Sequence, residues 1–323
     1  MIACGLIAFY LYGSSALISE DTFQSKVIFN EPVNTSQYQV GDTLSAMTYN
    51  IGYLSGMTNN TSAKREKEFF DLNLNAAIEL IKELNPDILG LQEIDFDANR
   101  SFHIHQGNQL GEQAGFIQGF HSVNWNKKYV PFPYDSFEQH FGSMLSGQSL
   151  LSKHPLNNST YFTMERPVNA PFYYNAFYLD RLIQVSELEI GGRIIIVMNL
   201  HLEAFDKETR MLHAKSVQQE YLKYYKEFPV LILGDFNSRT EYLDKDAMHF
   251  IMKSPDIRSA IDRTQYETDS THCYSYSSAH PEYMIDYILY NHTKIEKVSA
   301  NVIQYAGQIS DHFPVVFDFI LKD

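Results

Sequence analysis

Polar side chains repeatedly follow apolar runs in this chain, at points where a buried strand would end. Asn199 and His201 close the run IIIVMNLH, and Asp235 and Asn237 follow the run VLIL. Residues two apart on a strand point to the same face, so each pair is aimed together if its segment is extended. Because polar groups beside buried runs are costly unless paired or used, the recurrence predicts one shared site. Its other members are Asn50, Gln92, Glu93, Asp286, Asp311 and His312.

The types of these side chains indicate a reaction class. Glu93 with Asn50 offers the hard oxygen ligands that Mg²⁺ prefers. The chain has no HExxH motif and no cysteine cluster, which disfavours zinc, and it lacks the GxSxG, P-loop and GxGxxG motifs. The remaining carboxylates, Asn and His suit in-line attack of water on phosphorus. A metal would stabilise the charge, a His–Asp pair would activate the water, and a second His with an Asn would hold the phosphoryl oxygens.

Six motifs occur in an order that resembles the endonuclease/exonuclease/phosphatase superfamily. Singly, GDFN or SDH is a weak signal, whereas the ordered set is specific and extends over about residues 44–320. The resemblance implies an α/β fold, namely a four-layer sandwich of two mixed β-sheets packed face to face with helices on the outside. The motifs are YNIG (49–52), LQEID (91–95), NLHLEA (199–204), LILGDFNS (231–238), IDYILY (285–290) and SDHFPV (310–315).

The resemblance also implies a role for each matching residue. Asn50 and Glu93 match the Mg²⁺-binding Asn and Glu, and Asp311 matches a metal-linked or phosphate-site Asp. The implied cofactor is Mg²⁺, with Mn²⁺ or Ca²⁺ as alternatives. His201 matches the phosphate-binding His of the deoxyribonuclease and sphingomyelinase branches. The remaining implied catalytic residues are Asp235 and Asn237, which orient water and phosphate, His312 as the general base, and Asp286, which orients it.

The substrate class stays open between a lipid headgroup and a nucleic acid. The 323 residues carry a formal charge of −14, which repels nucleic acid at long range. An aromatic segment that includes Trp125, Phe132 and Phe141 favours a lipid or membrane-delivered substrate, although it could equally be a packed flap. Arg181 opens an apolar strand and is the best candidate to hold a phosphate, the alternative being an ordinary ion pair.

Strands alternate with helices from residue 44 onward. A helix over residues 64–84 is expected to bury Phe69, Leu72, Ala76, Leu80 and Leu84. Residues 95–142 lack clear periodicity and are interpreted as long loops with helical pieces. A further helix is expected over 209–226. The expected strands are 44–51, 88–94, 149–152, 182–190, 193–200, 230–233, 283–290 and 315–320.

Three segments are expected along the chain. Residues 1–20 are almost free of charge and predict a signal peptide or membrane anchor, the alternative being a mobile or buried tail. Residues 21–42 predict a linker, and residues 43–323 the domain of the resemblance. Membrane association through the N-terminus, and an exported or anchored protein rather than a cytoplasmic one, follow from the first segment. No obligate protein partner is indicated.

The function predicted is a Mg²⁺-dependent phosphoesterase, most readily a phosphodiesterase. One alternative is a non-specific deoxyribonuclease-like endonuclease. An alternative of another class is a non-catalytic binding or scaffold protein on the same fold, whose signature would be the loss of one or more site residues. Every matched position is intact.

Overall fold

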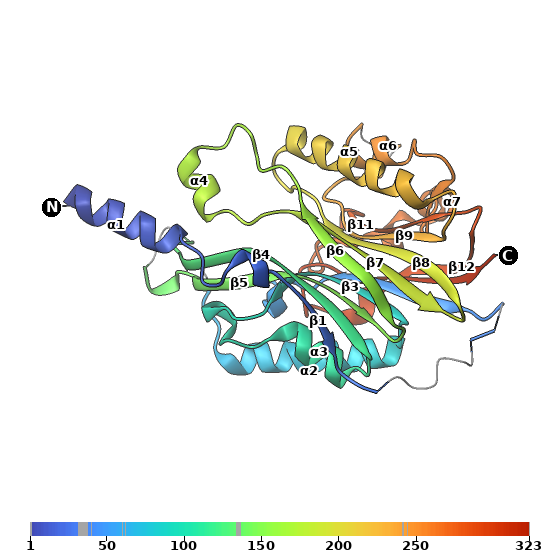
Figure 1. Cartoon of the computed structure of the whole chain (residues 1–323), viewed down its shortest axis with the longest axis horizontal. Coiled ribbons are helices and arrows are strands. Elements are labelled where there is room, and N and C mark those ends of the chain that lie inside the picture. Colours follow the sequence, from blue (N-terminus) through green and yellow to red (C-terminus); the bar gives the residue numbers. More distant parts are fainter. Residues whose placement is uncertain are drawn as a thin grey trace.

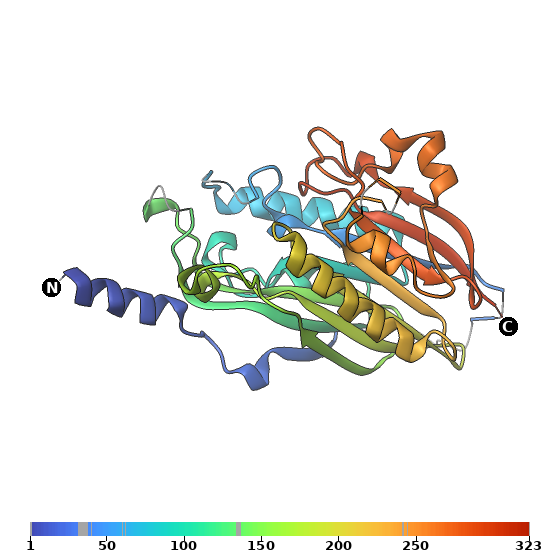
Figure 2. The ribbon, with the colours of Figure 1, turned by 90° about the horizontal axis from the view of Figure 1, so that it is seen from above.

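The computed structural model describes residues 2–31, 38–39, 41–59, 61, 63–133, 137–240, 242–243 and 245–322. Within these residues two mixed β-sheets pack face to face, and helices cover their outer faces (Figures 1 and 2). The expected α/β sandwich is therefore confirmed. Most of the buried apolar side chains lie between the sheets or under the outer helices.

The first sheet has seven strands and contains one parallel pair, β2 (Leu44–Asn50) with β3 (Ile88–Asp95). All its other neighbours are antiparallel. The spatial order is β1-β4-β5-β3-β2-β13-β12, with β1 (Gln24–Ile28), β4 (Gln118–Val130), β5 (Gly142–Ser152), β12 (Ile295–Val302) and β13 (Val315–Leu321).

The second sheet has six strands and also contains one parallel pair, β8 (Arg193–His201) with β9 (Val230–Asp235). Its order is β10-β11-β9-β8-β7-β6, with β6 (Leu156–Thr163), β7 (Leu182–Ile190), β10 (Ile257–Ser259) and β11 (Asp286–Asn291). Gly191 and Gly192 join β7 to β8, as the hairpin signal between these apolar runs predicts.

The longer helices cover the outsides of the two sheets. In Figure 1, α2 (Lys67–Leu84) and α3 (Gln106–Gln113) lie below the first sheet, and α5 (Lys207–Tyr224) lies above the second. The expected buried face of α2 is wrong in part, because Leu72 is 68% exposed and Ala76 is exposed too. The stripe that faces the sheet is instead Phe70, Leu74, Ala77, Ile78, Leu80 and Ile81. The shorter helices are α1 (Ile2–Ser14), α4 (Phe172–Phe177), α6 (Ala247–Ile251) and α7 (Arg263–Thr268).

Two sequence expectations fail for a shared reason. Residues 95–142, expected to be long loops with helical pieces, do contain the helix α3, but they also contain the long strand β4. The segment 21–42, expected to be a linker, contains the edge strand β1. These two strands pair with each other. Their side chains are mostly polar, so neither shows an apolar alternation, and only the pairing with their neighbours makes them strands.

The helix at the start of the described chain, α1, projects from one end of the molecule beside α4 (Figures 1 and 2). The segment after it is tied to β4, because Asn126 accepts hydrogen bonds from the backbone amides of Leu17 and Ile18. Among the described residues, no helix combines the length and the apolar character needed to cross a membrane.

Candidate active site

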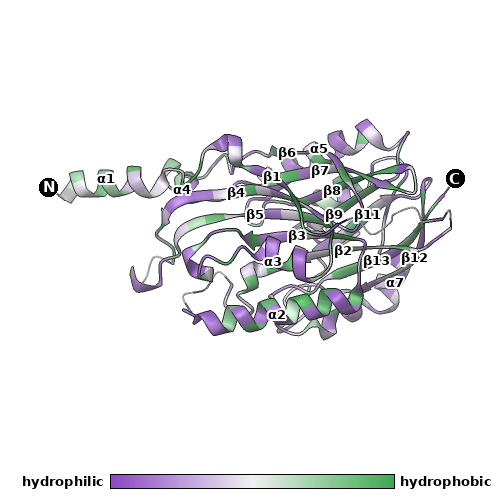
Figure 3. Ribbon diagram, turned by 60° about the horizontal axis from the view of Figure 1, so that its bottom comes forward, coloured by the Kyte–Doolittle hydropathy of each residue, from purple (hydrophilic) through white to green (hydrophobic). Residues whose placement is uncertain are grey.

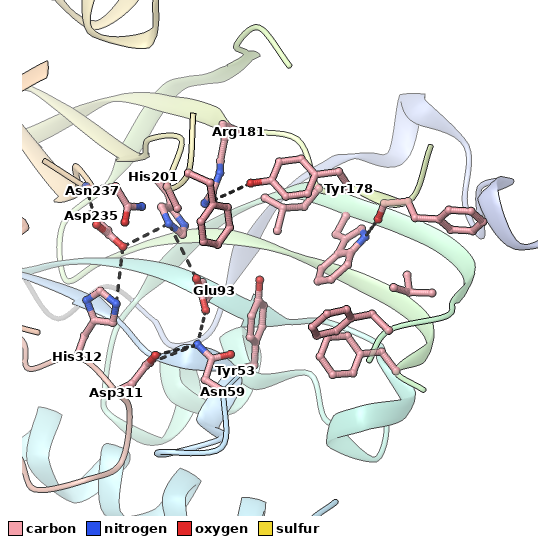
Figure 4. A pocket seen from close by; sticks show the side chains of 18 of the residues that line it. Tyr53, Asn59, Glu93, Tyr178, Arg181, His201, Asp235, Asn237, Asp311 and His312 are labelled. Atoms are coloured by element: carbon pink, nitrogen blue, oxygen red, sulfur yellow. Dashed lines mark hydrogen bonds and ion pairs between the residues drawn. The ribbon is translucent and has the colours of Figure 1, made fainter. Parts of the chain in front are cut away.

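The two parallel strand pairs end at the same edge of the sandwich, and their last residues meet there. Asn50 ends β2, and Glu93 lies near the end of β3. His201 ends β8, and Asp235 ends β9. Glu93, His201 and Asp235 line one end of a pocket of about 700 Å³ that both sheets border, and Asn50 lies beside it, where it donates to Asp235 (Figure 4). The shared site predicted from strand ends is therefore brought together by the fold.

His312 is held between two carboxylates. Its Nδ1 lies 2.8 Å from Oδ2 of Asp286, and its Nε2 faces Oδ2 of Asp235 at 3.8 Å. Both His312 and Asp286 are buried. Burial alone would lower the pKa of His312, but the carboxylate of Asp286, with Asp235 and Asp311 adding to it, raises this pKa well above its ordinary value. The ring is oriented and ready to hold a proton at Nε2.

Asp235 is the centre of the hydrogen-bonding network. Its Oδ2 accepts from Nδ2 of Asn50 at 3.0 Å and lies 3.3 Å from Nε2 of His201. Its Oδ1 accepts from the backbone amide of Asn237 at 2.9 Å. Burial alone would raise the pKa of Asp235, but the nearby imidazoles of His201 and His312 hold this pKa below its ordinary range. Asp235 is therefore an anion that faces the pocket.

Glu93 reaches the pocket through a break in the regularity of β3. The register with β5 shifts between Leu91 and Ile94, and Glu93 takes a φ of 51° in the left-handed region. Non-glycine residues adopt this conformation at a cost, and the surrounding structure must hold them there. The bulge turns Glu93 away from the regular alternation of the strand and toward His201, whose Nε2 lies 3.9 Å from Oε1 of Glu93.

Glu93 and Asp311 are drawn together by Asn59. Nδ2 of Asn59 donates to Oε2 of Glu93 at 2.8 Å and to Oδ1 of Asp311 at 3.2 Å. Burial raises the pKa of Asp311, and the nearby charge of Glu93 raises it further. Oδ1 of Asn59 is buried and has no hydrogen-bond partner among the described residues. Two carboxylates and an unpaired amide oxygen form a donor set that fits a hard divalent cation.

The side chain of Asn50 is already bonded to the protein at both ends, so it is less free to act as the predicted metal ligand. Its Oδ1 accepts from the backbone amide of Gly52 at 3.1 Å, while its Nδ2 points to Asp235. A second group of buried ligand atoms, from Asp235, Asp286 and His312, also lies within 4.8 Å of one another. Because the contact between His312 and Asp286 already pairs two members of that group, the side chains around Asn59 are the better cation site.

Arg181 lines the pocket on the same side as His201, opposite Asp311 (Figure 4). It is 5% exposed. Nε lies 3.7 Å from Oε2 of Glu203, and Nη2 donates to the hydroxyl of Tyr178 at 3.5 Å. Neither Nε nor Nη1 has a hydrogen-bond acceptor among the described residues. These two nitrogens are buried, and the guanidinium places a positive charge at the pocket wall.

Asn237 lines the same pocket, although its side chain is bonded to the protein. Nδ2 of Asn237 donates to the backbone oxygen of Leu202 at 3.1 Å, and its φ is 47°. The segment after Asp235 is therefore not extended at this residue. The expectation that Asp235 and Asn237 face the same way as strand neighbours does not hold, and the turn brings Asn237 to the pocket instead.

Four residues of the strand-end pattern do not line the pocket. Asn50 and Asp286 lie beside it, bonded to Asp235 and His312 respectively, and Gln92 and Asn199 lie deeper. Asn199 and Gln92 are fully buried between the sheets, where Nε2 of Gln92 donates to Oδ1 of Asn199 at 2.6 Å. Nδ2 of Asn199 in turn donates to Oε1 of Gln184 at 2.7 Å. This network satisfies buried polar groups and lies deeper than the site, so only His201 of its strand pair reaches the pocket.

Four further residues contribute to the site and are not marked by the strand-end pattern. In sequence, Asn59 shows only an Asn-x-Thr pattern, and Tyr276 shows no signal. Tyr276 packs its ring 4.8 Å from that of His312. Tyr178 donates to both carboxylate oxygens of Glu203, which follows His201 by two positions. All except Glu203 lie in loops, where residue spacing carries no periodic signal, and Glu203 lies just beyond β8.

Comparison with known proteins agrees with this architecture. A curated relative, the 5'-tyrosyl-DNA phosphodiesterase of Caenorhabditis briggsae, is 25% identical over 222 residues, which is 67% of this chain. The chain spans about half the length of that relative, since the match covers 51% of it.

Solved structures share the fold. An endonuclease/exonuclease/phosphatase from Bacteroides vulgatus matches with a TM-score of 0.60 and 17% identity over 87% of this chain and 100% of that one. The human Nocturnin catalytic domain, solved with a bound sulfate anion, matches with a TM-score of 0.59 and 20% identity over 93% and 97% of the two chains.

The family model described as the Endonuclease/Exonuclease/phosphatase family matches residues 47–312. Members of this family are generally hydrolases that act on phosphate ester or phosphodiester bonds. The matched segment includes Asn50 near its start and His312 at its end, with every other residue of the strand-end pattern between them. On this match, and on the fold it shares with the solved structures, the chain belongs to the endonuclease/exonuclease/phosphatase family.

Proposed function

We propose that this protein is a divalent-metal-dependent phosphodiesterase that cleaves a P–O bond with water activated by His312. The observation that carries the proposal is the placement of His312, oriented by Asp286 on one side and facing Asp235 on the other, in the same pocket as Glu93 and Asp311. A base and a cation site in one pocket are what metal-assisted attack of water on a phosphate ester requires. The C. briggsae relative, named as a phosphodiesterase, supports the bond class.

Each side chain in and beside the pocket has a separate role in the proposed reaction. Nε2 of His312 takes the proton of the attacking water, and Asp286 stabilises the imidazolium that forms. Asp235 accepts a hydrogen bond from that water and keeps it near the phosphorus. His201 and the guanidinium of Arg181 hold the non-bridging oxygens, where charge develops in the transition state.

The residues that would hold the cation are Glu93, Asp311 and Asn59, with Asn50 adjacent. When bound, a divalent ion of the Mg²⁺ class would neutralise the charge that develops on the phosphoryl group and the leaving oxygen. Mn²⁺ and Ca²⁺ accept the same oxygen donors, and we propose Mg²⁺ first because hard carboxylate and amide oxygens suit it.

The test is turnover of bis(p-nitrophenyl) phosphate, a soluble diester, alongside the monoester p-nitrophenyl phosphate. We expect the diester to be hydrolysed with Mg²⁺, and EDTA to abolish the reaction. His312→Ala and Asp235→Ala should lower kcat by about a hundredfold or more, since each removes a group that acts on the attacking water. His272→Ala, a side chain 78% exposed at the surface, is the matched control.

Two results would contradict the proposal. Full activity in both His312→Ala and Asp235→Ala would exclude the assigned base and its partner. Absence of turnover for any ester by the folded, metal-loaded protein would favour a binding or scaffold protein on the same fold. An endonuclease is the alternative within the same reaction class, and cleavage of plasmid DNA measures it directly.

A further inference from the structure

The pocket has two unlike halves. The polar half holds the residues of the proposed reaction, and the other half has apolar walls (Figure 4). A phosphoryl group and one water molecule occupy only the polar half, so the apolar half is available to the rest of the substrate. Its walls come from β4, from the segment between β4 and β5, and from α4 and the residues after it, namely Trp125, Val130, Phe132, Phe141, Tyr174, Phe177 and Leu179.

The charges around the pocket disfavour a nucleic acid strand in the apolar half. Among the described residues that line the pocket, Arg181 is the single Lys or Arg, whereas Glu93, Asp235 and Asp311 are acidic. Binding of a nucleic acid backbone relies on several Lys and Arg that follow the phosphates. An uncharged apolar group next to one phosphate fits these walls better than a chain of phosphates.

The outer surface at the same end of the molecule is also apolar. Most of the exposed large apolar side chains that the structure describes gather on α1, around α4 and at Phe205. Figure 3 shows α1 largely in green and pale shades at the tip of the molecule. Exposed apolar patches of this extent mark interaction surfaces. The patch comprises Leu6, Ile7, Phe9, Leu11, Tyr12, Leu17, Val168, Phe172, Tyr173, Tyr174 and Phe205.

The exposed patch is continuous with the wall of the pocket. The ring of Tyr10 on α1 lies 5.8 Å from that of Phe177, a pocket residue, and 6.1 Å from that of Phe172. Trp125 Nε1 donates to the backbone oxygen of Phe177 at 2.9 Å from the pocket side. Tyr174 and Phe205 belong to both the patch and the pocket lining.

The distribution of charge on and around α1 is that of a protein surface that contacts lipid. Residues 2–19 carry no charged side chain. Two lysines lie at the base of α1, where Nζ of Lys127 donates to the backbone oxygen of Ser14 at 3.2 Å and Nζ of Lys128 lies 5.8 Å from the ring centre of Tyr12. An apolar segment bordered by Tyr and Lys is typical of lipid interfaces, where the cations meet headgroup phosphates.

We infer that the phosphate ester hydrolysed at this site is carried by a lipid. Its phosphoryl group lies at the polar end of the pocket, its apolar part lies in the aromatic half, and the patch on α1, around α4 and at Phe205 holds the pocket mouth on the lipid surface. This inference rests on the proposed phosphodiesterase function.

The first experiment measures docking without turnover. The protein is floated with phosphatidylcholine vesicles in EDTA, and the bound fraction is compared with that of the Leu6→Glu/Leu11→Glu double variant. The two leucines are 64% and 62% exposed, and Leu72, 68% exposed on α2, supplies the control Leu72→Glu. We expect the double variant to lose about tenfold or more of its partitioning, because two apolar side chains no longer enter lipid. The control should bind like the unaltered protein.

A protein that stays with the soluble fraction, or a double variant that floats like the unaltered protein, would overturn the inference. In either case hydrolysis of the soluble diester would still report on the proposed function alone, so the two failures are distinguishable.

The second experiment tests the apolar half of the pocket. Three p-nitrophenyl phosphodiesters share one leaving group and differ in the second ester group, which is methyl, hexadecyl or thymidinyl. We expect kcat/KM to be at least about tenfold higher for the hexadecyl ester than for the methyl ester, as apolar burial predicts. In Leu179→Gln, a change at a half-buried wall residue, this preference should fall. A preference for the thymidinyl ester, or no preference, would overturn the lipid assignment.

Discussion

At the scale of single residues, the pocket concentrates buried charge. Asp235, Asp286, His201 and His312 are all 5% exposed or less. Burial of an unpaired charge is costly, so each of these groups depends on a neighbour of opposite charge or on a hydrogen bond. His312 meets this need through Asp286, and Asp235 through the two imidazoles and the amide of Asn50. These dependencies make the effect of single substitutions predictable.

Asp286→Asn should reduce catalysis far more than it reduces stability. The amide keeps the volume of the side chain but removes the charge that supports the imidazolium form of His312, whose pKa should then fall. We expect kcat to drop by roughly 10²- to 10⁴-fold with little change in KM. Steady-state kinetics on the soluble diester measure both constants. Asp269→Asn, at an exposed carboxylate, should leave kcat unaltered, and an unaltered kcat in Asp286→Asn would contradict the assigned role.

The buried ring of His121 should make the folded protein less stable in acid, by a mechanism that does not involve the pocket. Burial lowers its pKa to about 3, and its ring nitrogens contact the hydroxyl of Ser149 and the amide oxygen of Asn108. The folded state therefore favours the neutral ring, while the unfolded chain takes up a proton near pH 6.5. The contribution of His121 to the free energy of unfolding is fully present above that pH. It is lost between pH 6.5 and 3, by up to about 1.4 kcal/mol per pH unit.

Urea unfolding at pH 7 and pH 5 measures this effect. His121→Gln cannot take up the proton, so its loss of stability between the two pH values should be smaller than that of the unaltered protein. Equal losses in the two proteins would assign the acid sensitivity to other groups.

At the scale of elements, close strand contacts place the site. The parallel pair β8 and β9 must approach closely for His201 and Asp235 to meet, and Gly234 makes this approach possible. A Cβ at Gly234 would lie 2.0 Å from the backbone oxygen of Leu200, and its φ is +151°. Gly90 serves the contact between the sheets in the same way, since a Cβ there would lie 1.9 Å from a methyl carbon of Leu233.

Gly234→Ala should damage both stability and activity. Displacement of β9 from β8 should lower the free energy of unfolding by roughly 2 kcal/mol or more and move Asp235 relative to His201. Gly192→Ala is the matched control, because its φ is +76° and no atom lies within 4 Å of the added Cβ. We expect the control to cost only about 1 kcal/mol of strain and to keep kcat. Equal effects at both glycines would show that strand contact is not the cause.

At the scale of the whole molecule, the cation site connects segments of the first sheet that lie far apart in the sequence. Glu93 belongs to β3 in the first sheet, Asp311 precedes β13, and Asn59 lies in the loop after β2. A cation that binds these residues binds the folded chain and not the unfolded one, so it stabilises the entire fold. The like charges of Glu93 and Asp311 oppose folding when the cation is removed.

Mg²⁺ should therefore raise the thermal midpoint of the protein, and EDTA should reverse the rise. At a hundred times the dissociation constant, the expected gain is about 2.7 kcal/mol. Glu93→Gln and Asp311→Asn should reduce this response, and Asp311→Asn should be at least as stable as the unaltered protein in EDTA, because a buried repulsion is removed. Differential scanning calorimetry with and without Mg²⁺ measures both effects. An unaltered Mg²⁺ response in Asp311→Asn would move the cation site elsewhere.

The sequence by itself determined the apolar strands, their hairpin and most of the polar residues at their ends. Apolar runs and Gly-Gly turns are local properties, and the order of motifs from Asn50 to His312 is a property of the chain alone. It also indicated the donor types from which a phosphoesterase mechanism can be argued.

Other features were decided only by the tertiary structure. The polar strand β4 exists because β1 and β5 pair with it. The buried face of α2 is set by the sheet beneath it, because its helical pattern allows two neighbouring stripes and packing selects one. Asn59 and Tyr178 lie in loops, where spacing has no period, and the bulge at Glu93 depends on the partner strand. Local pattern therefore predicts the apolar elements, whereas contacts between distant segments decide which of their faces are buried and which side chains meet.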